Sequence, residues 1–117
     1  MLFDFDTFSR IVRRVYPHGS AYSLNDALTV FHEYFRRYEE KTGRAHPNIR
    51  GEQIRAIISK MPRIERQGVS GQPIDIQPED YPAIIDRHFL TEYRRCDWNI
   101  NHFFSGRIRE LRFYEAL

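Results

Sequence analysis

One stretch of the chain limits the possible folds more than any other, because its apolar residues recur at the three- and four-residue spacing of an amphipathic helix. Ser23, followed by Asp26, forms a typical helix start before this stretch, and Gly43 is a typical residue at a helix end. The apolar stripe consists of Ala27, Leu28, Phe31, Tyr34, Phe35 and Tyr38. The pattern predicts a helix over Leu24–Thr42 that places its aromatic side chains in the core.

Two shorter helices are expected on either side of this one. Asp4 can cap the first, which must end before Pro17 because the residue preceding a proline avoids helical geometry. The other is expected to open at Pro47-Asn48 and to close at Pro62. Its inward stripe consists of Ile54, Ile57, Ile58 and Met61.

Two more segments with helical spacing follow near the C-terminus. Pro78, with two acidic residues directly after it, opens the first of them. Asp97 can cap the second, although Gly106 in its interior disfavours a helix by about 1 kcal/mol relative to alanine. The side chains expected to point inward from this last helix are Ile100, Phe103, Phe104, Ile108, Leu111 and Tyr114.

The segment 63–77 lacks helical spacing, and glycines and a proline interrupt it. Two extended pieces, 63–66 and 73–77, can pair as a short ribbon around a glycine-containing turn, and an irregular loop accounts for the same residues equally well. We therefore expect a mainly α fold with about five amphipathic helices in one domain over residues 1–117. A short two-stranded β-ribbon at 63–77 is one of the two alternatives for the segment after the third helix.

Composition limits the classes of function. Aromatic residues make up 15% of the chain, which is unlike a disordered sequence. The formal net charge of +2 is too small by itself for strong non-specific attraction to nucleic acid or anionic lipid. All but two of the 18 basic residues are arginine, a side chain suited to phosphate, carboxylate and aromatic contacts. A GC-rich genome would produce the same bias without any functional cause.

The cysteine content indicates the compartment. Because Cys96 is the sole cysteine, an internal disulfide and a zinc site built from cysteines are excluded, and a reducing environment is indicated. The first residues include acids where a secretory signal requires basic residues, and no long apolar run follows. We expect a soluble, cytoplasmic protein with no membrane partner.

The spacing of reactive side chains predicts neither metal binding nor catalysis. No two histidines have the i,i+3 or i,i+4 spacing of paired ligands. Cys96 follows Arg94-Arg95, which could lower its pKa, but no base stands at a defined spacing from it. We therefore expect a non-enzymatic protein without a cofactor, and catalytic residues scattered along the chain are the alternative. The histidines are His18, His32, His46, His88 and His102.

The helix that ends at Pro62 should have a polar outer face. If its isoleucines are buried, Arg55 and Ser59 point outward with Lys60 at the edge, and Arg63 and Arg66 follow in the ribbon segment. Two helices followed by an arginine-bearing ribbon is the order of a helix-turn-helix or winged-helix domain, which binds the major groove. We therefore predict contacts with double-stranded DNA, made by Arg55, Ser59, Lys60, Arg63 and Arg66, the arginines mainly at phosphates.

Two features depart from that motif. The helix over Leu24–Thr42 is long for it, and the turn from Gly43 to Asn48 exceeds the usual three or four residues. A solvated charged face is one alternative, and a protein–protein adaptor or homodimer with no nucleic-acid role is another. A second basic cluster, interleaved with glutamates, should form surface ion pairs or pair across such a dimer; it consists of Arg94, Arg95, Arg107, Arg109 and Arg112.

The C-terminal residues 99–106 and 112–115 resemble small accessory proteins carried on bacterial plasmids and conjugative elements. The resemblance covers a small part of the chain. It implies a bacterial-type accessory role in DNA transactions.

Overall fold

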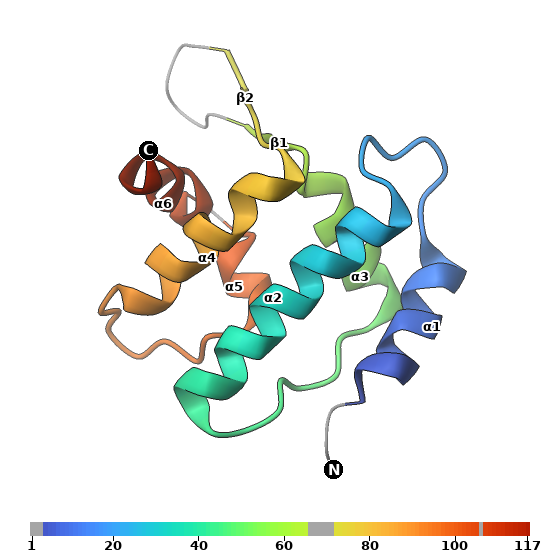
Figure 1. The fold of residues 1–117 in the computed structure, drawn as a ribbon, viewed down its shortest axis with the longest axis horizontal. Helices are drawn as coiled ribbons and strands as arrows, with labels where there is room; N and C mark the ends of the chain where they lie inside the picture. The colour runs from blue at the N-terminus through green and yellow to red at the C-terminus, as the bar shows by residue number, and fades with distance from the viewer. Residues whose placement is uncertain (1–3, 66–71, 106) are drawn as a thin grey trace.

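The computed structural model describes residues 4–65, 72–105 and 107–117 (Figure 1). It confirms the mainly helical fold and contains the short antiparallel ribbon. The elements in chain order are α1 (Phe5–Val15), α2 (Leu24–Thr42), α3 (Gly51–Lys60), β1 (Arg63–Ile64), β2 (Ile74–Asp75), the 3-10 turn η1 (Pro78–Asp80), α4 (Tyr81–Leu90), α5 (Ile100–Phe103) and α6 (Ile108–Ala116). None of the described helices is long and apolar enough to cross a membrane.

Helix α2 has the bounds predicted from its sequence, because both of its ends carry the expected capping interactions. The Ser23 Oγ accepts a hydrogen bond from the backbone N–H of Asp26 at 3.1 Å. Gly43 ends the helix in the left-handed conformation, with φ at 72°, and its N–H donates to the Glu39 carbonyl at 2.8 Å. The predicted stripe is buried apart from Leu28, which is partly exposed.

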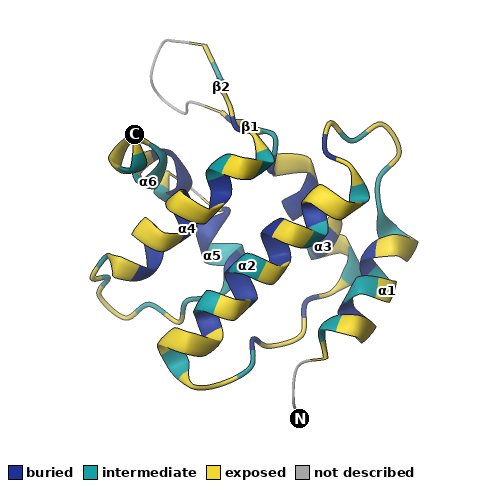
Figure 2. Ribbon diagram, in the orientation of Figure 1, coloured by how far each residue is buried: buried dark blue, intermediate teal, exposed yellow. Residues whose placement is uncertain are grey.

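The core lies around α2. Helix α4 packs against α2 and α6, and α1 packs against α2 and α3 (Figures 1 and 2). The Phe8 ring of α1 meets the Phe35 ring of α2 edge-on, with centroids 5.0 Å apart. On the other side, the buried Tyr34 ring contacts Phe89 of α4 and Phe103 of α5. The aromatic stripe of α2 therefore joins both halves of the molecule.

Helix α3 begins later than predicted. The expected start at Pro47-Asn48 is wrong, because residues 45–50 are not helical and α3 begins at Gly51. The Gln53 side chain accepts a hydrogen bond from the Arg50 N–H at 3.0 Å and caps the helix there, while the side chain of His46 is buried in the segment before it. Its Nε2 accepts a hydrogen bond from the Ile100 N–H at 3.0 Å, which holds this segment against the start of α5.

The single helix predicted after Asp97 is also wrong, because the chain forms the two helices α5 and α6 there. The break between them changes which residues of α6 face inward. Leu111 and Tyr114, predicted as core residues, are each 44% exposed, whereas Arg109 and Glu110 are buried. The prediction failed because it extended one continuous helical period across the break.

The ribbon pairs Arg63 of β1 with Asp75 of β2, directly opposite one another. It is held to the core at its base, where Ile64 and Ile76 are buried. Residues 66–71 lie outside the described residues, so the predicted contact Arg66 has no structural account. The α2–α3 connection remains longer than a helix-turn-helix requires, and α3 has α1 as its packing neighbour.

Candidate nucleic-acid interface

The outer face of α3 is polar, as predicted. Ile54, Ile57 and Ile58 are buried, and the exposed residues include Arg55, Ser59 and Lys60. The Ser59 hydroxyl donates to the backbone carbonyl of Arg55 at 3.0 Å, so its proton is used within the helix. Phosphate oxygens accept hydrogen bonds, and for this reason Arg55 and Lys60 are the stronger candidates on α3.

Helix α1 adds three arginines that the sequence patterns did not identify as contacts. Arg10, Arg13 and Arg14 are exposed, and their spacing of three and four residues places them on one side of the helix. Helix α1 approaches α3 so closely that a Cβ on Gly51 would stand 3.1 Å from Cγ1 of Val15. The signal available in the sequence was the position of these arginines opposite the apolar stripe of α1.

Exposed cations that form no ion pair with a described residue therefore occur on two packed helices, and Arg10 has a weaker electrostatic interaction with Asp4. None of these five residues, which we call the α1–α3 cations, forms an ion pair within the described part of the chain: Arg10, Arg13, Arg14, Arg55 and Lys60. The contrast with α2 is clear, since Arg36 binds Glu33 and Glu40 at 2.7 and 2.6 Å. The acidic residue on α3, Glu52, is itself engaged by Arg50 at 3.3 Å. The α1–α3 cations are thus available to an external anion.

Arg63 is less available than predicted. Its Nε lies 3.2 Å from Oδ1 of Asp75, across the ribbon, and both side chains are more than half exposed. An exposed ion pair of this kind contributes little to stability and exchanges readily. Arg63 can reach a phosphate only by leaving Asp75.

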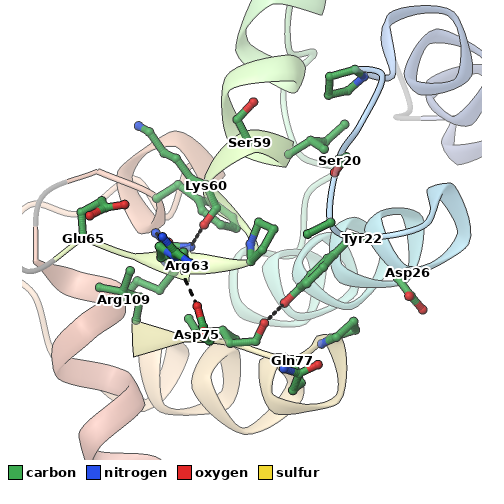
Figure 3. Close-up of a pocket in the computed structure, with 18 of the residues that line it drawn as sticks. Ser20, Tyr22, Asp26, Ser59, Lys60, Arg63, Glu65, Asp75, Gln77 and Arg109 are labelled. Atoms are coloured by element: carbon green, nitrogen blue, oxygen red, sulfur yellow. Dashed lines mark hydrogen bonds and ion pairs between the residues drawn. The ribbon is translucent and has the colours of Figure 1, made fainter. Parts of the chain in front are cut away.

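A groove of about 780 Å³ lies between the loop after α1 and the base of the ribbon (Figure 3). Ser59, Lys60 and Arg63 line it, so it brings together three of the predicted contacts. The Tyr22 hydroxyl donates to the Ile76 carbonyl and ties the loop to the ribbon. The lining of the groove is of mixed charge, because it also includes Asp26, Glu65 and Asp75. The groove by itself does not favour a phosphate over another polar ligand.

Arg109 also lines this groove, and its hydrogen bonds connect the elements around it. The guanidinium donates to the backbone carbonyls of Lys60 and Arg63, the latter at 3.0 Å, and to the Tyr81 hydroxyl at 2.9 Å. It also lies over the Phe104 ring, 5.1 Å from the centroid. The prediction that Arg109 belongs to a surface ion-pair cluster is wrong, because it is buried and joins the end of α3 to the ribbon.

The other four arginines of the second basic cluster differ in whether they form ion pairs. Arg107 pairs with Glu110 at 3.8 Å and Arg112 with Glu115 at 3.2 Å, which confirms the predicted ion pairing for these two arginines. Arg94 and Arg95 are exposed and make no ion pair with any described residue.

Comparison with protein families, with curated proteins and with solved structures finds no significant match.

Proposed function

We propose that this protein is a non-enzymatic, cytoplasmic DNA-binding or DNA-transaction accessory protein that holds double-stranded DNA on the α1–α3 cations. The proposal is supported by the presence of exposed cations without ion pairs among the described residues on two helices in close contact. On α2, by contrast, Arg36 is bound by two glutamates. Duplex DNA carries one negative charge per about 1.7 Å of its axis, so neighbouring arginines can each meet a phosphate. The guanidinium fork suits phosphate oxygens particularly well.

The contacts are assigned mainly to phosphates. The net charge of +2 gives little long-range attraction, so binding should depend on these local contacts and fall steeply with salt. Arg55, near the middle of α3, is the one side chain proposed to reach a base edge, as arginine does at guanine. Ser59 and Arg63 make secondary contributions, since each already has a partner within the protein.

Fluorescence anisotropy of a labelled duplex across a salt series tests the proposal. If each of the α1–α3 cations neutralises one phosphate, the slope of log K against log salt is about −4 to −5. Replacing Arg13 and Arg14 together by glutamine should reduce the size of the slope by about 2. The double variant Arg44→Gln/Arg87→Gln is the matched control, because it removes the same two charges and both arginines are exposed, lie outside α1 and α3, and make no ion pair within the described residues.

Two results would overturn the proposal. One is the absence of DNA binding at low salt by the folded wild-type protein. The other is an equal loss in the α1 double variant and in Arg44→Gln/Arg87→Gln, because this would assign binding to net charge and not to the α1–α3 cations.

A second candidate function is supported by a different surface. Four large apolar side chains are exposed on α4, on α6 and at the end of the chain: Leu90, Leu111, Tyr114 and Leu117. Helices α4 and α6 pack together, so this apolar surface could seal a second copy of the chain. Light scattering that gives a dimer mass, together with a monomer mass for Leu111→Glu, would favour this function if DNA fails to bind.

A further inference from the structure

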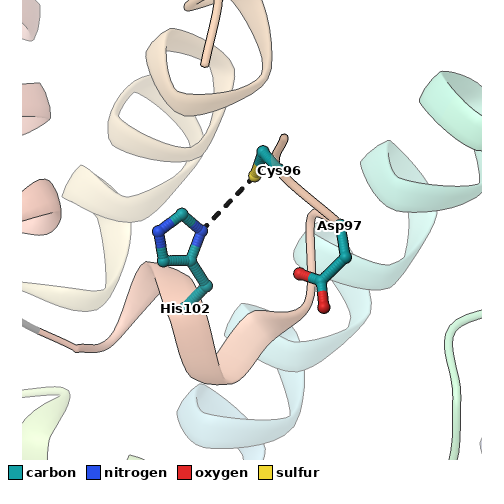
Figure 4. A group of neighbouring side chains, drawn as sticks. All are labelled: Cys96, Asp97 and His102. Carbon is teal, nitrogen blue, oxygen red and sulfur yellow. Dashed lines mark hydrogen bonds between the residues drawn. The ribbon is translucent and has the colours of Figure 1, made fainter. Parts of the chain in front are cut away.

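Three side chains that commonly bind metals meet where the chain passes from α4 to α5. The ligand atoms of Cys96, Asp97 and His102 all lie within 4.8 Å of one another (Figure 4). The Cys96 Sγ and the His102 Nδ1 are 3.3 Å apart. Sequence spacing did not reveal this group, because it contains a single histidine and a single cysteine that belong to a loop and to the helix after it.

The distances suit a tetrahedral zinc ion. With Zn–S near 2.3 Å and Zn–N near 2.05 Å, the sulfur and nitrogen ligands of such an ion stand about 3.6 Å apart. The observed Sγ–Nδ1 distance differs from this by a few tenths of an ångström. Asp97 is exposed, and its Oδ1 accepts a hydrogen bond from the Asn99 N–H at 3.0 Å, so its Oδ2 is the oxygen assigned to the ion.

Burial raises the pKa of the Cys96 thiol, which corrects the expectation that Arg94-Arg95 would lower it. A metal ion that binds Cys96 displaces the thiol proton, so one proton is released for each ion bound. The Trp98 N–H, which is 3.3 Å from Sγ, would stabilise the resulting thiolate.

The backbone and the surroundings hold the group in place and leave it open on one side. Arg95 and Trp98, which flank Cys96 and Asp97, have φ values of 60° and 63°, and they are the non-glycine residues with positive φ among those described. Such geometry costs about 1 kcal/mol or more per residue and persists only where other contacts enforce it. Cys96 and Asp97 also line a pocket of about 400 Å³ beside the end of α2.

We propose that Cys96 Sγ, an Asp97 carboxylate oxygen and His102 Nδ1 bind one Zn²⁺ ion whose fourth position opens to this pocket. The sulfur, nitrogen and oxygen donors form a mixed set that suits zinc and does not suit Mg²⁺ or Ca²⁺, which prefer oxygen ligands alone. The ion would tie the loop between α4 and α5 to α5. This inference departs from the expectation that the chain binds no metal, and it is independent of DNA binding.

Cobalt titration of the reduced, chelator-treated full chain is the test. Co²⁺ reports the site directly, because a thiolate ligand gives a near-ultraviolet charge-transfer band and a tetrahedral site gives intense visible bands. We expect one Co²⁺ per chain, release of about one proton per ion, and displacement of cobalt by Zn²⁺. Cys96→Ser should abolish the charge-transfer band, and Asp97→Asn and His102→Gln should each weaken zinc binding at least tenfold.

His18→Gln is the matched control, since His18 is an exposed histidine in the loop after α1 and should leave zinc affinity unchanged. Circular dichroism of the metal-free variants establishes that they are folded. If Cys96→Ser does not fold, the wild-type charge-transfer band and the exposed substitution Asp97→Asn decide the question. The proposal fails if wild-type protein gives no thiolate band, or if Asp97→Asn and His102→Gln bind zinc as tightly as wild type.

Discussion

Protonation of His88 should make the folded state lose stability steeply below about pH 6.5. The His88 ring is completely buried, and its two nitrogens face the hydroxyls of Tyr34 and Tyr93 at 3.1 and 2.9 Å. The Tyr34 hydroxyl proton is already donated to the Trp98 carbonyl at 2.8 Å. The Nε2–H of His88 must therefore donate to Tyr34, which leaves Nδ1 to accept from Tyr93. The neutral ring has both of its hydrogen-bond requirements satisfied.

The magnitude follows from the pKa of this group. Burial, followed by the positive charges of His102 and Arg112, lowers the pKa of His88 from 6.5 to about 3. A lowered pKa means that the unfolded chain binds a proton that the folded chain does not. The stabilising contribution is complete above pH 6.5 and is lost between pH 6.5 and pH 3. At about 1.4 kcal/mol per pH unit, roughly 3 kcal/mol is lost by about pH 4.5.

Urea unfolding at neutral pH and at about pH 4.5 measures this loss, with Trp98, the sole tryptophan, as the fluorescent probe. His88→Gln is the comparison, because glutamine cannot titrate. Carboxylates titrate in both proteins, so the difference between the two pH dependences isolates His88. Wild type should lose about 2–3 kcal/mol more than His88→Gln over this range. An equal pH dependence in the two proteins, or an imidazolium signal from folded His88 in NMR at pH 5, would refute the reasoning.

Substitutions at three further positions test the contacts that set the fold. Arg109→Met should lower the free energy of unfolding by about 3 kcal/mol, because buried backbone carbonyls lose their donor. Arg109→Lys should restore only part of this stability. An unchanged urea midpoint in the methionine variant would contradict the contact. Gly43→Ala should cost about 1 kcal/mol because of its φ of 72°, with Gly43→Asn costing less in the same assay. Ser23→Ala should cost about 1 kcal/mol through loss of the cap on α2, and a melting temperature equal to that of wild type would dismiss the cap.

Local sequence signals predicted the elements whose structure depends on local interactions. Ser23 and Gly43 mark the ends of α2 because each satisfies backbone groups within a few residues of itself. The isoleucines of α3 predicted its buried side because their spacing matches the helical period. The ribbon was one of two alternatives, because no local pattern in 63–77 shows that Ile64 and Ile76 are buried in the core.

Apart from the break between α5 and α6, the failures involve partners that are distant in sequence. The non-helical segment before α3 is held by a hydrogen bond between His46 and Ile100, which no local pattern reveals. Arg109 is buried because the ends of α3 and β1 present carbonyls to it, whereas a helical-period argument places a charged residue outside. The arginines of α1 were missed because no local pattern reveals that α1 packs against α3.

An NMR titration of ¹⁵N-labelled protein with a short duplex at low salt shows which residues the DNA contacts. Amide shifts should concentrate in α1 and α3, around Arg13, Arg14 and Arg55, and should reverse as salt is added. Shifts confined to α4 and α6, or no shifts at all, would contradict the claim that the α1–α3 cations bind DNA.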